Sequence, residues 1–157
     1  MIVRRRFIVS TPLLLLPAFL GGCAAGAKPA ASLALTVIGG ADQNPDNAGP
    51  AAPVSVEIFQ LSDSGAFNAA TPLALLGNPG SLLGTTLTAP MGQLIVAPGQ
   101  TVAVDRKLAP ITQFIGIAVF FRDIDQAHWR VVLPIAAHKV NRAVLRITGI
   151  KAMLSKR

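Results

Sequence analysis

The chain has 157 residues, a formal net charge of +7, 52% hydrophobic residues and one cysteine. Removing the first 22 residues leaves 135, enough for one domain, and lowers the charge to +4, with 11 Lys and Arg against 7 Asp and Glu. A single cysteine excludes an internal disulfide framework, and the scattered bases do not favour a nucleic-acid-binding face.

Residues 1–22 have the three parts of an export signal. Three arginines at 4–6 precede an apolar stretch at 7–20, and two glycines follow it. The apolar stretch is about 14 residues, shorter than the roughly 20 that a membrane-spanning helix needs, and it contains two prolines. We therefore expect a cleaved signal peptide rather than an uncleaved membrane anchor. The segment Arg4-Arg5-Arg6-Phe7-Ile8 also resembles a twin-arginine motif, so both the Sec and the twin-arginine export routes stay open.

Cys23 ends the segment Leu20-Gly21-Gly22-Cys23, which resembles the lipobox of a bacterial lipoprotein. In that interpretation Cys23 becomes the lipidated N-terminus, residues 23–32 form a tether, and several acyl chains give stable membrane attachment. An ordinary signal peptidase site that leaves Cys23 as a free thiol is the alternative. Ala24 stands where the common enterobacterial sorting pattern has Asp for inner-membrane retention. The sequence therefore predicts an outer-membrane lipoprotein that faces the periplasm.

Residues 33–157 have the pattern of one all-β domain. The segments expected as strands are 33–38, 53–61, 85–89, 93–97, 100–106, 113–122, 128–135 and 142–147. Residues 113–122 are apolar on both faces, which is typical of a central strand covered on both sides, and Gly116 indicates a bulge or a close backbone approach. Residues 65–84 contain leucines and two prolines, so we expect short helical turns at an end or edge of a sheet. Together these patterns predict an antiparallel two-sheet β-sandwich with short helical insertions.

The long connection at residues 39–52 contains Asn-Pro and Gly-Pro turn signals. At about 14 residues it has a length that is uncommon for structureless loops inside compact domains. Two interpretations stay open, a floppy hairpin connection and a partner-binding loop.

Residues with catalytic or metal-binding chemistry are few and separated. His128 and His138 lack further ligands at metal-site spacing, and Asp123 with Asp125 reads as a solvated turn. We expect no enzyme, no metal, no cofactor and no small-molecule substrate. Trp129 is either a core residue or an exposed binding anchor, with its strand position favouring the core, and the neighbouring arginine is expected to point the opposite way.

Several pieces in order resemble one family. They are the lipobox at Cys23, Asn44-Pro45-Asp46 with Gly49, residues 53–61, Phe67 with Leu75-Leu76, Pro98-Gly99, and residues 115–123 followed by Trp129-Arg130. In this order and spacing the chain resembles the outer-membrane lipoprotein of the type VI secretion system, the TssJ family. Where the family commonly has Tyr in the second strand, this chain has Phe59, which keeps the ring and loses a hydroxyl.

The resemblance implies a transthyretin-like β-sandwich that anchors the type VI membrane complex. Its partner would be the periplasmic C-terminal region of TssM, with TssL reached indirectly through the complex. Carried over from the family's contact loop, the partner-binding residues would be Asp42, Gln43, Asn44, Pro45, Asp46, Asn47 and Gly49. The alternative is a generic periplasmic β-sandwich lipoprotein that binds a ligand or inhibits an envelope enzyme.

Overall fold

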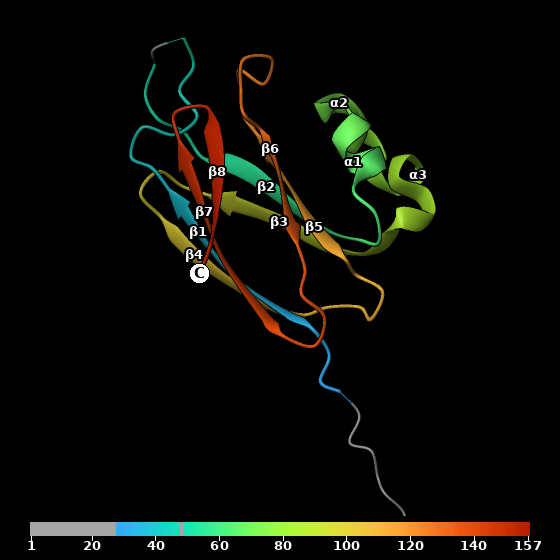
Figure 1. Ribbon diagram of the computed structural model, residues 1–157. Helices are drawn as coiled ribbons and strands as arrows, with labels where there is room; N and C mark the ends of the chain where they lie inside the picture. The colour runs from blue at the N-terminus through green and yellow to red at the C-terminus, as the bar shows by residue number, and fades with distance from the viewer. Residues whose placement is uncertain (1–27, 48) are drawn as a thin grey trace, which may run out of the picture.

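The computed structural model describes residues 28–47 and 49–157, so Cys23 and the leader lie outside the described residues. This part of the chain forms two four-stranded sheets packed face to face, with short helices over the outside of one sheet (Figure 1). The all-β sandwich with helical insertions is therefore confirmed. The strands are β1 (Ser32–Gly39), β2 (Val54–Leu61), β3 (Leu87–Val96), β4 (Thr101–Lys107), β5 (Phe114–Phe120), β6 (Arg130–Pro134), β7 (Val140–Thr148) and β8 (Lys151–Lys156).

The first sheet has the strand order β4-β1-β7-β8. Leu33, Leu35 and Val37 of β1 are buried against the second sheet, and the residues between them lie half-buried on the outer face. β1 runs antiparallel to β4 but parallel to β7. The predicted antiparallel arrangement therefore holds for the other paired strands and is wrong at this pair. β1 and β7 can run parallel because the chain passes through the whole second sheet between them, which supplies the long crossover that parallel neighbours need.

The second sheet has the order β3-β2-β5-β6. Val54, Val56 and Ile58 of β2 are buried on its inner face, as the alternation predicts. β5 pairs with β2 on one side and β6 on the other, and its residues 115–119 are all buried. This confirms the central strand covered on both sides.

The insertion between β2 and β3 contains α1 (Gly65–Ala69), α2 (Pro72–Gly77), α3 (Pro79–Leu83) and the 3-10 turn η1 (Gly84–Thr86). The side chains of Thr71 and Asn78 accept hydrogen bonds from the N–H groups of Ala74 (3.3 Å) and Ser81 (3.1 Å), and a proline begins each of these two helices. The prolines divide the segment, so the helices stay short. None of the described helices is long and apolar enough to cross a membrane.

Phe67 anchors this insertion on the outer face of the second sheet. It is fully buried, and its ring centroid lies 5.8 Å from that of Phe59. A Cβ on Gly116 would lie 3.0 Å from the Phe67 ring, so the close backbone approach expected at this glycine is confirmed. Leu75 and Leu83 are buried beside Phe67. The prediction that these leucines lie at an end or edge of a sheet is wrong, because the apolar outer face of the sheet requires a cover.

Two strand predictions also differ from the structure. The separate segments 85–89 and 93–97 form the single strand β3, which has register shifts against β2 and a positive φ at Gly92. Strand β8 has no predicted counterpart, because only Ala152 and Leu154 of its six residues turn inward and the segment reads as a charged chain end. Pairing with β7 decides its conformation.

Candidate partner-binding loop

The connection between β1 and β2, residues 40–53, crosses the end of the sandwich opposite to the segment that precedes β1 (Figure 1). Gly40 lies against the first sheet, where its N–H donates to the carbonyl oxygen of Ile147 at 2.7 Å. A Cβ on Gly40 would lie 2.6 Å from that oxygen, so a larger residue cannot make this turn without displacing the strand.

Gln43 ties the loop to the second sheet. Its side chain is fully buried, and Nε2 donates to the carbonyl oxygens of Val96 (2.7 Å) and Ala52 (3.3 Å). The Ala52 N–H donates back to the backbone oxygen of Gln43 at 3.0 Å. Gln43 therefore closes the loop on itself and on the end of β3.

Asn44 joins three further segments. Its exposed fraction is 3% and its φ is 51°. Nδ2 donates to the carbonyl oxygen of Pro53 and Oδ1 accepts from the N–H of Arg122, both at 2.7 Å. Its own N–H donates to the oxygen of Gly149, also at 2.7 Å. Asparagine tolerates the left-handed backbone and supplies both a donor and an acceptor, which this position requires.

The tip of the loop faces outward. Asp46 and Asn47 are exposed, and Asn47 has a φ of 38°. The N–H of Gly49 donates to the backbone carbonyl oxygen of Asp46 at 2.5 Å. Pro45 is half-buried between the base and the tip. The loop thus has a clamped base and a turned, exposed tip.

Seven loop residues are predicted to contact the partner, and their positions divide into two groups. Asp42, Asp46, Asn47 and Gly49 are exposed and available to a partner, and Pro45 is partly so. Gln43 and Asn44 are buried, and their side-chain hydrogen bonds hold the base of the loop. The predicted contact role of the seven stays a prediction, and the exposed members are the ones that can serve it directly.

The sequence analysis does not associate the loop with the segment after β5. The hydrogen bond from Arg122 to Asn44 brings the exposed Asp123 and Asp125 to the same end of the sandwich as Asp42 and Asp46. Four exposed carboxylates therefore lie at this end of the sandwich. The chain places these residues almost 80 positions apart, so only the tertiary structure reveals the acidic surface.

The two histidines lie at opposite ends of the sandwich and are exposed. The backbone of His128 forms an isolated β-bridge with Lys151 beside the loop, whereas the Nδ1 atom of His138 lies 2.9 Å from the carbonyl oxygen of Pro29. They cannot share a metal ion. No group of three or more His, Cys, Asp or Glu within residues 28–47 and 49–157 is arranged to hold one.

Trp129 is partly buried and packs against both the core between the two sheets and the apolar cluster around Phe67, as the core interpretation predicts. Arg130 does not point away from it, since its guanidinium carbon lies 4.7 Å from the indole centroid. Nη1 of Arg130 also donates to the carbonyl oxygens of Phe67 (3.1 Å) and Ala70 (3.0 Å) at the end of α1. The arginine turns toward the helix because the carbonyl groups of its last turn can accept further hydrogen bonds; the Phe67 oxygen also accepts from the Ala70 N–H at 3.3 Å.

The sequence model of the family described as "Type VI secretion lipoprotein, VasD, EvfM, TssJ" matches residues 31–150, most of the chain. The chain belongs to this family. Membership gives it a role in type VI secretion, and the family assignment made from the ordered motifs is confirmed. No curated protein sequence is a significant match to the chain.

Solved structures share the fold. The T6SS lipoprotein TssJ1 from Pseudomonas aeruginosa is 26% identical with a TM-score of 0.79 over 82% of this chain and 98% of that chain. A chain in a structure described as "Type VI membrane complex" is 29% identical, with a TM-score of 0.69 over 79% and 97%. A chain in a structure described as the TssM C-terminal domain from EAEC is 28% identical, with a TM-score of 0.67 over 78% and 99%.

Proposed function

We propose that this chain is the outer-membrane anchor of a type VI secretion membrane complex and binds the periplasmic region of TssM. The family match, the lipobox at Cys23 and the loop at residues 40–53 support this function. Similar chains in structures described as a type VI membrane complex and as a TssM domain support the choice of partner. TssL would be reached through the complex. In this proposal the chain acts as a structural anchor, without catalysis, cofactor or small-molecule substrate.

The clamped base of the loop is the observation that carries the proposed binding mode. Buried hydrogen bonds from Gln43 and Asn44 fix both sides of the base before any partner arrives. Binding then costs little of the conformational entropy that a floppy loop would lose. The exposed tip can therefore present Asp46 and Asn47 in one orientation.

The chemistry of the surface indicates basic groups on the partner. Asp42, Asp46, Asp123 and Asp125 are exposed at the loop end of the sandwich, where the bases are Arg122, Arg146 and Lys151. Opposite charge on the partner speeds the encounter and fixes the register of the two surfaces. The loop has no aromatic side chain, so neighbouring segments must supply part of the affinity.

A binding experiment with charge-neutral variants tests the partner surface. We expect Asp42→Asn with Asp46→Asn to weaken binding of the TssM periplasmic region by about tenfold or more, in line with loss of two interfacial charges. The matched control is Asp63→Asn with Asp105→Asn, which removes two exposed carboxylates outside the loop. Equal affinity of the loop variant and the wild-type chain, measured by calorimetry, would exclude the loop as the contact.

Envelope fractionation tests the anchor separately. We expect Cys23→Ser to leave a folded, partner-competent domain that is no longer in the outer-membrane fraction and no longer supports secretion. Secretion at the wild-type level from cells that carry this variant would show that lipid attachment is dispensable.

A further inference from the structure

We propose that the end of the sandwich from which the tether leaves is a docking surface for the anionic phospholipid headgroups of the leaflet that holds Cys23. This proposal rests on the proposed lipidation of Cys23. It assigns a second membrane contact to the folded domain itself, and with it a fixed orientation of the partner-binding loop.

Three backbone and side-chain contacts gather the loops of this end around the exit of the tether. The N–H of Leu108 donates to the oxygen of Ala31 at 2.9 Å, and the N–H of Ser32 donates to the oxygen of Lys139 at 3.0 Å. The ring of His138 lies 2.9 Å from the oxygen of Pro29. The connections after β4 and after β6 therefore flank the point where the chain turns toward the membrane (Figure 1).

Basic and apolar side chains are exposed on this end. Lys107 pairs in register with Ser32, and Lys28 and Lys139 lie beside the tether exit. Lys28 also lines a groove of about 210 Å³ together with Pro110 and His138. Ile111 projects from the adjoining loop with 64% of its surface exposed. Exposed bases beside an exposed aliphatic side chain are typical of proteins that rest on an anionic membrane surface.

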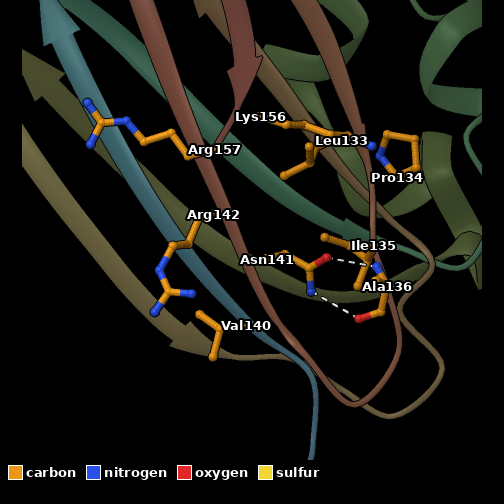
Figure 2. A pocket seen from close by; sticks show the side chains of 9 residues that line it. All are labelled: Leu133, Pro134, Ile135, Ala136, Val140, Asn141, Arg142, Lys156 and Arg157. Atoms are coloured by element: carbon orange, nitrogen blue, oxygen red, sulfur yellow. Dashed lines mark hydrogen bonds between the residues drawn. The ribbon is translucent and has the colours of Figure 1, made fainter.

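Further bases lie in the same half of the first sheet. A groove of about 390 Å³ lies at the edge of the sandwich. Figure 2 shows its lining residues, among which the side chain of Asn141 forms hydrogen bonds with the backbone of Ala136. Arg142 and Arg157 lie at this groove and extend to the same side of it, across β1 (Figure 2). Lys156 also lines the groove, so this half of the molecule carries more positive charge than the tether exit alone.

The acidic residues have the opposite distribution. Four of the seven, Asp42, Asp46, Asp123 and Asp125, are in the loops at the far end of the sandwich. Asp63 and Asp105 are the acidic residues nearer the tether, and the bases in that half are more numerous: Lys28, Arg106, Lys107, Lys139, Arg142, Lys156 and Arg157. The domain therefore has a strongly positive end at the tether, whereas at the loop end Arg122, Arg146 and Lys151 nearly balance the four carboxylates.

The length of the tether makes this charge separation effective. Nine residues, 23–31, join Cys23 to β1, and they can span at most about 30 Å. A domain held this close stays within reach of the surface, and each base near an anionic surface contributes roughly a fivefold preference for contact. The eight residues of β1 would then hold the partner-binding loop about 25 Å from the headgroups, facing the periplasm.

Amide hydrogen exchange of the mature lipidated protein tests the proposal. The protein is reconstituted in phosphatidylcholine vesicles with and without phosphatidylglycerol. We expect several-fold slower exchange at residues 107–113 and 136–140 in the anionic vesicles, no change at residues 41–47, and loss of the difference in high salt. Equal exchange in the two vesicles would refute the docking surface.

Variants separate this surface from general attraction. Lys107→Gln with Lys139→Gln should abolish the protection, and Arg122→Gln with Lys151→Gln, which removes two bases at the far end, should keep it. Slow exchange in β5 shows in the same data that each variant is folded. Equal loss in both variants would refute the proposal, and so would protection that persists in the Lys107→Gln, Lys139→Gln protein. If the protein does not float together with either type of vesicle in a density gradient, the lipid anchor is refuted, and this orientation is refuted with it.

Discussion

Replacing Asn44 with alanine is expected to destabilise the domain far more than its place in a loop indicates. The substitution removes the hydrogen bond to the Pro53 oxygen and the one from the Arg122 N–H, both 2.7 Å long. It also places alanine at a φ of 51°, where asparagine is tolerated and a Cβ-bearing apolar residue is strained.

The magnitude follows from these three losses. Each hydrogen bond contributes about 1 kcal/mol net to stability, and the left-handed backbone costs alanine about 1 kcal/mol more. The free energy of unfolding should therefore fall by about 3 kcal/mol. With a urea slope of about 2 kcal/mol per molar for a domain of this size, the unfolding midpoint should fall by about 1.5 M.

Urea denaturation of the mature chain with Cys23→Ser measures this shift. Asn47→Ala is the matched control, because Asn47 also has a positive φ (38°) but is exposed at the tip. The control should lose only the backbone contribution, about 1 kcal/mol. If Asn44→Ala and Asn47→Ala destabilise the chain equally, the side chain of Asn44 does not hold the loop and the argument for a clamped base is wrong.

Three further substitutions test the packing and electrostatics of the fold. Gly116→Ala places a methyl group 2.9 Å from a leucine side chain, so thermal unfolding should show a loss of about 1–3 kcal/mol, whereas Gly77→Ala, which meets open space, should cause no loss. Arg130→Met should lower the free energy of unfolding by about 2 kcal/mol, because it removes two hydrogen bonds to backbone carbonyls. It should also change the fluorescence of the single tryptophan, Trp129, and an unchanged spectrum would exclude stacking of the arginine on the indole. Burial raises the pKa of the Glu57 carboxyl in the folded chain, so the folded chain binds this proton more tightly than the unfolded chain does. The proton therefore stabilises the fold at low pH, and this contribution is lost as the pH rises through the folded pKa. Glu57→Gln should match the wild type near pH 4 and be more stable at pH 7, as followed by urea midpoints, and an opposite trend would exclude the burial effect.

The sequence predicted the elements whose pattern is local. Val54, Val56 and Ile58 alternate with polar residues, so the inner face of β2 follows from a period of two. The two-sided apolar run of β5 predicted a strand covered on both faces, and Pro72 with Pro79 predicted short helices. Such patterns involve only residues that are neighbours in the sequence, so they can be recognised without the tertiary structure.

The sequence could not predict which strands meet or which polar residues are buried. The parallel pairing of β1 with β7 joins segments about 110 residues apart, and β8 becomes a strand only because β7 offers it an edge. Glutamine and asparagine are mostly exposed in proteins, and asparagine also favours turns. Gln43 and Asn44 are buried here because carbonyl and N–H groups at the ends of β2, β3 and β5 need partners.

The sequence by itself determined the sandwich class, the family and the position of the long loop, because each rests on local pattern or on motif order; the export signal at residues 1–22 stays a prediction. Only the tertiary structure decided how that loop works. It divides the loop into a clamped base and an exposed tip, places Asp123 and Asp125 beside it, and gathers the bases at the tether end. These properties depend on contacts between distant segments, and such contacts exist only after the two sheets have packed together.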